Sequence, residues 1–176
     1  MQNITNNDPE FLPWYNIDQI AFLESNKNKL KTFDVFEYGG GNSTLYYLTR
    51  VKSLYTVESR EVWFNFVKSN ANKIDYNIDF NIYLVRSNFA SSIKLCNKRF
   101  DLIVVDSNER AKCIEIAPDY LNDNGWILLD NSERENLKAS HEFLKTRGFS
   151  SKNFSSKKVE SDEISYSTLF IKEQKH

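Results

Sequence analysis

Short apolar runs and amphipathic stretches alternate along this chain, a pattern typical of a layered α/β protein. Five apolar runs predict strands, at 33–38, 53–57, 78–84, 100–106 and in the segment after Gly125. The fourth run is almost wholly apolar, as expected for a parallel strand with both faces covered. The sequence therefore predicts a mainly parallel sheet.

Apolar residues between these runs recur at helical spacing. Helices are expected ahead of the first strand, from about Ser43, after Ser59, at about 110–121 and at about 133–147. Pro118 should kink or shorten the fourth of these helices, and Gly148 should end the fifth. The segments Phe149–Ser155 and Tyr166–Ile171 predict a closing pair of strands, joined by a long polar turn.

Composition narrows the class of protein. The chain has 176 residues, the size of one domain, and its 23 basic and 24 acidic residues nearly balance. This balance favours neither nucleic acid nor a membrane surface. No apolar run approaches membrane-spanning length, and the stretch Met1 to Pro13 is too polar for a signal peptide. Cys96 and Cys113 predict neither a metal pair nor a disulfide framework, so we expect a cytoplasmic protein. The sequence gives no indication of its oligomeric state.

The most informative segment is a glycine turn. Three of the five glycines, Gly39, Gly40 and Gly41, directly follow the first apolar run and precede a helix. A sharp turn from strand to helix needs the backbone freedom of glycine. The same turn lets a ligand approach the main chain and the positive end of the helix. We therefore expect a nucleotide or cofactor loop here.

Two carboxylates refine that expectation. Glu58 ends the second apolar run, 19 residues after Gly39, where an acidic residue of a βαβ nucleotide site meets the ribose hydroxyls. Glu37 lies two residues before Gly39, where it would repel a pyrophosphate and attract a cation such as an α-ammonium group. Glu58 thus fits a nucleotide site, whereas Glu37 points away from a dinucleotide and toward a cofactor that contains an amino acid.

The segment Glu37–Thr44 resembles the E-x-G-x-G-x-S-T loop of class I S-adenosylmethionine (SAM)-dependent methyltransferases. The segments Phe100–Asp106 and Gly125–Asn131 resemble the fourth and fifth strands of that family, so the resemblance covers about residues 33–131. It implies a single three-layer domain with a doubly wound sheet of about seven strands, the last antiparallel. Residues 1–32 would form a helical extension, 33–131 the cofactor-binding core, and 132–176 a C-terminal helix and strand pair.

The resemblance also implies roles for single residues. Gly39, Gly41 and Ser43 would line the methionine part of the cofactor, and Glu58 would take the ribose. Glu37 and Asp106 would also belong to the cofactor-binding residues. Ser87 and Asn88 would lie near the adenine amino group, where many relatives place an acidic residue. Trp63 could cover the adenine, but its helical spacing favours a place in the core.

Candidate catalytic groups gather at two strand ends. Asp106 ends the fourth predicted strand, and Asp130 and Asn131 end the fifth. The trio is similar to the Asp…Asp-Asn set that binds Mg²⁺ in catechol-type O-methyltransferases. Three interpretations stay open: a Mg²⁺ site, direct contacts to substrate or cofactor, and capping of the next helix by Asp130-Asn131-Ser132. The capping explanation is adequate, so Mg²⁺ is not favoured.

The remaining polar candidates are weaker. His141 lies in a predicted helix and His176 is the last residue, so neither is a persuasive base. Arg110 and Arg134 each follow a strand end, where an arginine can bind a carboxylate or phosphate or simply start a solvated helix. The leading hypothesis is a SAM-dependent methyltransferase that acts on a small molecule, at oxygen. The alternatives are a NAD-dependent oxidoreductase and a methyltransferase-like binding protein without activity.

Overall fold

The computed structural model describes residues 11–172 of the chain. The strands are β1 Asp34–Tyr38, β2 Ser53–Glu58, β3 Asp79–Leu84, β4 Phe100–Val105, β5 Leu121–Asp130, β6 Phe149–Lys157 and β7 Ile164–Lys172. The α-helices are α1 Ile17–Ser25, α2 Lys27–Leu30, α3 Asn42–Tyr47, α4 Glu61–Ala71, α5 Arg110–Ile116 and α6 Lys138–Thr146. Three 3-10 helices complete the described part: η1 Phe89–Cys96, η2 Ala117–Tyr120 and η3 Glu135–Leu137.

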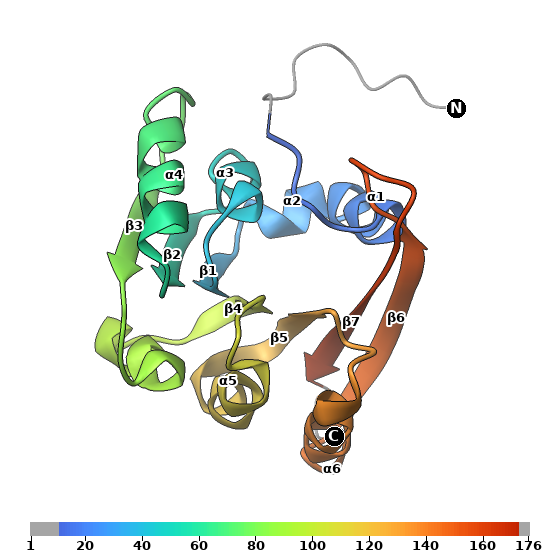
Figure 1. The fold of residues 1–176 in the computed structure, drawn as a ribbon. Coiled ribbons are helices and arrows are strands. Elements are labelled where there is room, and N and C mark those ends of the chain that lie inside the picture. Colours follow the sequence, from blue (N-terminus) through green and yellow to red (C-terminus); the bar gives the residue numbers. More distant parts are fainter. Residues whose placement is uncertain (1–10, 173–176) are drawn as a thin grey trace.

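All seven strands of this part form one sheet, in the order β3-β2-β1-β4-β5-β7-β6 (Figure 1). Strands β1 to β5 pair in parallel, and β7 runs antiparallel to both of its neighbours. The chain order reverses between β1 and β4, which is the switch point where open α/β sheets bind ligands. The predicted doubly wound, mainly parallel sheet is therefore confirmed.

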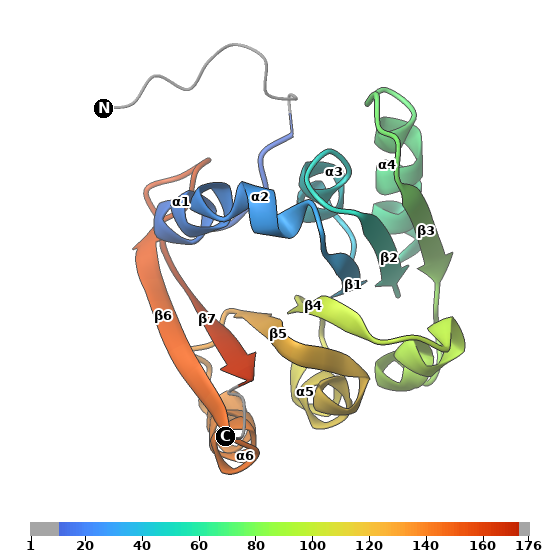
Figure 2. The same ribbon diagram turned by 180° about the vertical axis from the view of Figure 1, so that it is seen from behind.

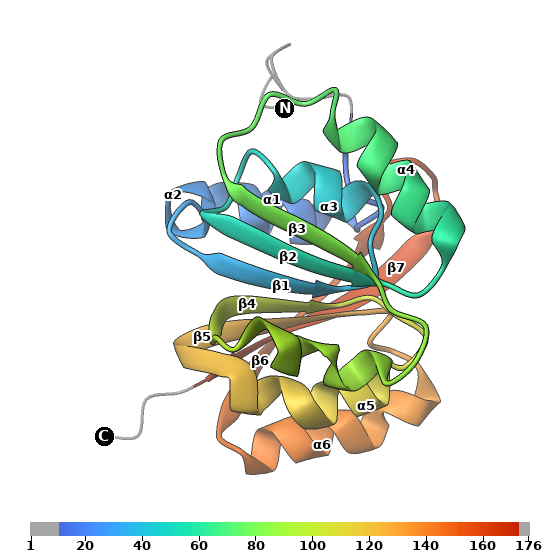
Figure 3. The same ribbon diagram turned by 90° about the vertical axis from the view of Figure 1, so that its left-hand side faces the viewer.

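Helices cover both faces of the sheet, so the domain has three layers (Figure 3). Helices α1 to α4 lie on one face, and α5 and α6 lie on the other (Figure 3). Successive strand residues enter opposite cores, as the two-residue period of a strand requires. In β4, Leu102 and Val104 join the core under α1–α4, whereas Ile103 and Val105 join the core over α5 and α6.

Helices α1 and α2 cover the part of the sheet near the antiparallel strands β6 and β7. Helix α1 packs on β6 (Figure 2). The Asn16 side chain caps this helix through a 2.8 Å bond from the Gln19 N–H, and its amide donates to the Ser167 hydroxyl of β7. The predicted helical extension thus packs against the C-terminal strand pair. Residues 1–10 and 173–176 of the predicted division lie outside the described residues.

Three local expectations can be compared with the structure. Helix α5 ends at Ile116 and continues as the 3-10 helix that holds Pro118, as the proline predicted. Gly125 was expected to precede the fifth strand, but β5 begins four residues earlier and contains it, because β4 and β5 change register between Phe100 and Leu102. The turn between the last two strands was expected to be long, but it spans only 158–163. Strands β6 and β7 are longer than their apolar residues indicated, and they pair along their whole length.

Gly39 lies at the switch point, where the ends of β1 and β4 come into close contact. It has a φ of +96°, and a Cβ placed on it would lie 1.8 Å from the carbonyl oxygen of Asp106. The backbone that follows β1 therefore touches the backbone that follows β4, an approach that only glycine permits. This contact brings the glycine turn and Asp106 to the same point.

Gly39→Ala should lower the free energy of unfolding by more than about 3 kcal/mol, because strain at positive φ adds to a backbone clash. Gly148 is a matched control, since its φ is +82° but nothing lies within 4 Å of its notional Cβ. Gly148→Ala should cost only the strain, about 1–2 kcal/mol. Urea unfolding of both variants measures the difference, and equal losses would show that the close approach of Gly39 to Asp106 does not matter.

Candidate functional site

Two neighbouring hollows open at the carboxyl ends of β1, β2 and β4, with volumes of about 130 and 160 Å³. They share Gly39, Glu58, Arg60 and Asp106, so they form one continuous depression. The first is lined further by Trp14, Tyr15, Gly40, Gly41, Asn42, Ser43 and Trp63. The second is lined further by Ser59, Phe89, Ser107, Asn108, Arg110 and Arg134.

The glycine turn is held by internal hydrogen bonds. The Gly39 N–H donates to the Val57 carbonyl at 2.8 Å, and the Gly40 N–H donates to Glu58 Oε2 at 2.9 Å. The Gly41 N–H donates to the Thr44 hydroxyl at 3.0 Å. All three glycine N–H groups are therefore paired within the protein. A pyrophosphate could not bind them without breaking these bonds.

Glu37 lies under the turn, fully buried, and is not among the residues that line the hollows. Its carboxyl group accepts hydrogen bonds from the hydroxyls of Ser43 at 2.5 Å, Thr44 at 2.6 Å and Thr56 at 2.9 Å. Burial raises the pKa of Glu37 to about 7, although these three hydroxyls act in the opposite direction. Glu37 thus reaches the depression through Ser43, which does line it.

Glu58 is the buried carboxylate of the depression, with 4% of its surface exposed. Its Oε1 accepts the N–H groups of Ser59 at 2.8 Å and Arg60 at 2.7 Å, and its Oε2 accepts the N–H of Gly40. A carboxylate offers about four lone-pair positions, so one position on Oε2 is left for a ligand. The side chain therefore braces the turn and still offers an acceptor.

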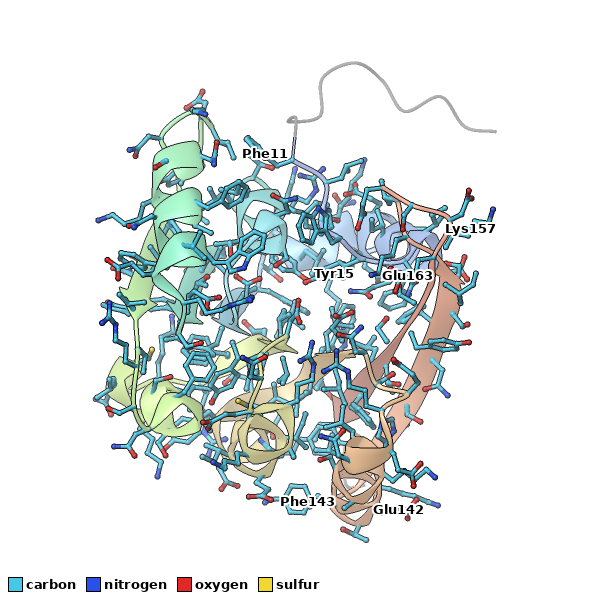
Figure 4. The ribbon with its side chains drawn as sticks, viewed as in Figure 1. Phe11, Tyr15, Glu142, Phe143, Lys157 and Glu163 are labelled. Carbon is cyan, nitrogen blue, oxygen red and sulfur yellow. The ribbon has the colours of Figure 1, made fainter. Side chains whose placement is uncertain are left out.

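The wall of the first hollow contains residues that sequence reasoning missed. Trp14 and Tyr15 come from the segment before α1, which carries no motif that would mark them. The Trp14 and Trp63 rings pack edge to face at 5.4 Å. Trp63 was expected in the core, but it lies over the turn, 3.8 Å from a notional Cβ on Gly41. In Figure 4, Phe11 and Tyr15 are labelled on the segment that leads into α1, and Tyr15 is the buried one.

An apolar hollow adjoins the first one. It has a volume of about 400 Å³ and is lined by Phe11, Trp14, Asn42, Val62, Trp63 and Phe66. Trp14, Asn42 and Trp63 line both hollows, so the two are continuous. At their junction, Asn42 Oδ1 is buried without a hydrogen-bond partner. A buried acceptor without a donor is costly, and this atom is shielded by the surrounding protein.

The strand ends hold a different arrangement from the one expected. The structure brings Asp106, Asp130 and Asn131 together, but around the guanidinium of Arg110. Arg110 Nη2 donates to Asp106 Oδ1 at 2.5 Å and to Asn131 Oδ1 at 2.8 Å. Its Nε donates to the carbonyl of Asp130 at 2.9 Å, its Nη1 donates to the carbonyl of Ser107, and the carboxylate of Asp130 lies 3.7 Å away.

The trio therefore does not fit a metal ion. The oxygens that would bind Mg²⁺ already surround a cationic side chain that is only 8% exposed. Within residues 11–172, no group of three or more His, Cys, Asp or Glu side chains could hold a metal. The capping interpretation is wrong too, because the next helix begins at Glu135 and has no side-chain cap. Arg110 is buried, contrary to a solvated helix start.

Other predicted residues lie apart from the depression. Ser87 and Asn88 follow β3, but neither is among the residues that line the two hollows; their neighbour Phe89 lines the second. His141 packs on Phe170 and its Nε2 lies 3.0 Å from the Ser132 carbonyl, on the face away from the turn. His176 lies outside the described residues.

Burial raises the pKa of Asp130 above its usual range, and the charge of Asp106 raises it further, while the charge of Arg110 lowers it. Of the trio, only Asp106 lines the hollows. Asp130 and Asn131 lie behind Arg110, which separates them from the depression.

Comparison with known proteins identifies the fold. No family model matches the chain, and no curated protein matches its sequence. One similar solved structure is an O-methyltransferase from Streptomyces achromogenes that is involved in tomaymycin synthesis, in complex with SAM. Its TM-score is 0.71 at 14% sequence identity, and the match covers 94% of this chain and 83% of that one. An O-methyltransferase from Bacillus cereus in complex with SAH has a TM-score of 0.69 at 17% identity, over 93% and 84%.

An N-methyltransferase from Bradyrhizobium japonicum is also similar, with a TM-score of 0.59 at 12% identity, over 89% of this chain and 96% of that one. At such identities the likeness shows the fold alone. The chain has the fold of class I methyltransferases, as its glycine loop and strands indicated. None of the helices within residues 11–172 is long and apolar enough to cross a membrane.

The buried carboxyl of Glu37 should make stability depend on pH. Its folded pKa lies above the value of 4.5 expected in the unfolded chain, at about 7, so between these values the folded protein holds a proton that the unfolded chain releases. The free energy of unfolding therefore falls as pH rises through this window.

Glu37→Gln removes this titration and leaves the other groups in place. The difference in free energy of unfolding between wild type and Glu37→Gln should decrease from about pH 4.5 to about 7 and be constant above. Urea unfolding at a series of pH values measures it. Parallel curves for the two proteins would contradict a raised pKa at Glu37.

Proposed function

We propose that the chain is a SAM-dependent methyltransferase that acts on a small molecule, at oxygen. The observation that carries the proposal is Glu58, a buried carboxylate beside a glycine turn, with one acceptor position left toward the depression. That position can accept a hydrogen bond from one hydroxyl of a ribose. Structures with this fold that were solved with SAM and SAH support the choice of cofactor.

The two hollows suit the two halves of this cofactor. The hollow with Phe89, Ser107 and Asn108 offers a ring and polar groups for an adenine. In the other, Gly41 and Ser43 would line the methionine part, beside Asn42. Glu37 would position Ser43 rather than touch the ligand. Ser87 and Asn88 remain candidates for the adenine edge only.

When bound, SAM supplies a methyl group on a sulfonium, and the protein must align an acceptor atom with it and remove a proton. Asp106 is the candidate group for both tasks, because it lines both hollows at the turn. Its Oδ1 is held by Arg110, which fixes the carboxylate and leaves its other oxygen available. Asp130 and Asn131 would act by holding Arg110 in place.

The alternatives have less support. A NAD-dependent oxidoreductase would use the glycine N–H groups for a pyrophosphate, and all three are already paired. Thr44 also replaces the third glycine of G-x-G-x-x-G. A binding protein without activity would have the same cofactor affinity and no turnover, so an acceptor panel distinguishes it. We further propose a cytoplasmic protein without a nucleic-acid partner.

The apolar hollow bears on the acceptor. Its lining is almost free of polar groups, it is continuous with the first hollow, and Val62 is 71% exposed at its rim. An acceptor with an apolar body could lie on Trp14, Trp63 and Phe66 and reach Asp106 with a hydroxyl group. Burial of such a body would contribute about 25 cal/mol for each Å² removed from water.

S-Adenosylhomocysteine (SAH) should bind the wild-type protein, with heat measured by calorimetry, and NAD should not. Gly41→Val should abolish binding without unfolding the chain, because a side chain there would point into the first hollow, where Trp63 is 3.8 Å from the notional Cβ. Glu58→Ala should weaken binding by about 1.5–3 kcal/mol. Glu61→Ala is the control, since Glu61 pairs with Arg86 outside the hollows. No heat from SAH with wild type would refute the cofactor.

Val62→Lys tests the acceptor's apolar body. The charge would be placed at the rim of the apolar hollow, away from the turn, so SAH affinity should be unchanged. The kcat/KM for phenolic or alkyl alcohols should fall at least about tenfold, and the loss should be smaller for polyols. Val159→Lys, at another exposed apolar residue, is the control. Equal losses for polar and apolar alcohols would show that the hollow does not bind the acceptor.

A further inference from the structure

Arg110 lies where a divalent cation would be expected in an Asp…Asp-Asn set. Four of its contacts go to the loops that follow β4 and β5: the Asp106 carboxylate, the Asn131 amide oxygen, and the main-chain oxygens of Ser107 and Asp130. A metal ion at this position would join the same two loops. The guanidinium instead uses four of its five N–H donors for that purpose.

The positive charge of the arginines around the trio equals that of a divalent ion. Asp106 and Asp130 bring two negative charges to the strand ends. Arg134 adds a second guanidinium, whose Nη2 donates to the same Asn131 Oδ1 at 3.0 Å. Two arginines and two carboxylates are therefore gathered around one amide oxygen. A divalent ion would supply the same positive charge, so the arginines leave it no electrostatic role.

The geometry points to Arg110 as the resident cation of the trio: it replaces a divalent ion, and shortening it uncovers a divalent-cation site. The planar guanidinium binds several oxygens in one plane, whereas Mg²⁺ requires about six around it. Once the Arg110 side chain is gone, Asp106, Asp130 and Asn131 can supply three oxygens to such an ion, which then has to compete only with the exposed Arg134 for Asn131 Oδ1. In the wild-type protein the trio is a positioning device that fixes Asp106 at the edge of the hollows.

This inference does not depend on the proposed methyl transfer, because the experiment contains neither cofactor nor acceptor. Mn²⁺ is titrated into the full chain, and the free ion is followed by electron paramagnetic resonance. A thermal melt with and without millimolar Mg²⁺ is the second readout. Wild type should bind no Mn²⁺ at the trio and show no shift with Mg²⁺, whereas Arg110→Ala should bind one Mn²⁺ and regain thermal stability with either ion.

Two further variants make the result specific. Arg110→Ala combined with Asp130→Asn should lose the bound Mn²⁺, because one of the three oxygens no longer carries charge. Arg147→Ala is the matched control, since Arg147 pairs with Asp119 at 2.6 Å on the exposed surface, and it should not gain a metal response. If Arg110→Ala binds no more Mn²⁺ than Arg147→Ala, the inference is wrong.

The wild-type protein provides a test that does not depend on the folding of a variant. Binding of Mn²⁺ by wild type that Asp130→Asn abolishes would overturn the inference, because the ion would then displace Arg110. No binding by wild type, and none by the charge-conserving Arg110→Lys, supports it. If the chain transfers methyl groups as proposed, EDTA should leave the rate unchanged.

Discussion

The site depends on one backbone contact, the approach of Gly39 to the carbonyl of Asp106. Because this contact joins the ends of β1 and β4, it places the glycine turn and Asp106 at one depression, and Glu58 of the adjacent β2 lies beside them. The hydrogen bonds of the turn then follow: Gly40 reaches Glu58, Gly41 reaches Thr44, and Thr44 reaches the buried Glu37. A side chain at position 39 would separate the two strand ends and open this network.

Charge is distributed around the depression in an ordered way. Glu37 lies beneath the turn with three hydroxyl donors and a pKa raised to about 7, so near that pH about half of its charge is suppressed. Glu58 is held by main-chain N–H groups and keeps one acceptor position. On the opposite side Arg110 forms ion pairs with the carboxylates of Asp106 and Asp130. Each buried carboxyl group of the site thus has donors of its own, as buried charges require.

Much of the fold could be predicted from the sequence. Apolar runs and helical spacing identify the elements, and the glycine turn with the two later strands identifies the doubly wound sheet. The errors have physical causes. The start of β5 and the lengths of β6 and β7 are set by backbone pairing with neighbours, which polar residues such as those of β6 do not reveal.

The site was less predictable. Chain connectivity fixes Gly39, Gly41 and Ser43 at the turn. Glu58 and Asp106 were found beside it because the carboxyl ends of parallel strands meet at one edge of a sheet. Trp14 and Tyr15 come from the segment before α1, and no local pattern marks them. Trp63 was considered for the adenine, but its helical spacing favoured the core. Arg110 was seen as a possible anion binder, but its contacts with both strand ends depend on the β4–β5 pairing and could not be read from spacing. The Asp…Asp-Asn spacing therefore did not reveal that an arginine side chain lies among these three residues.

The central claim is that the depression binds SAM through Glu58 and the glycine turn. A crystal structure of the protein with SAH tests it most directly. We expect the ribose hydroxyls within hydrogen-bond distance of Glu58 Oε2, the methionine part beside Gly41, Ser43 and Asn42, and Arg110 still between Asp106 and Asn131. SAH bound elsewhere, or a ribose turned away from Glu58, would contradict the account.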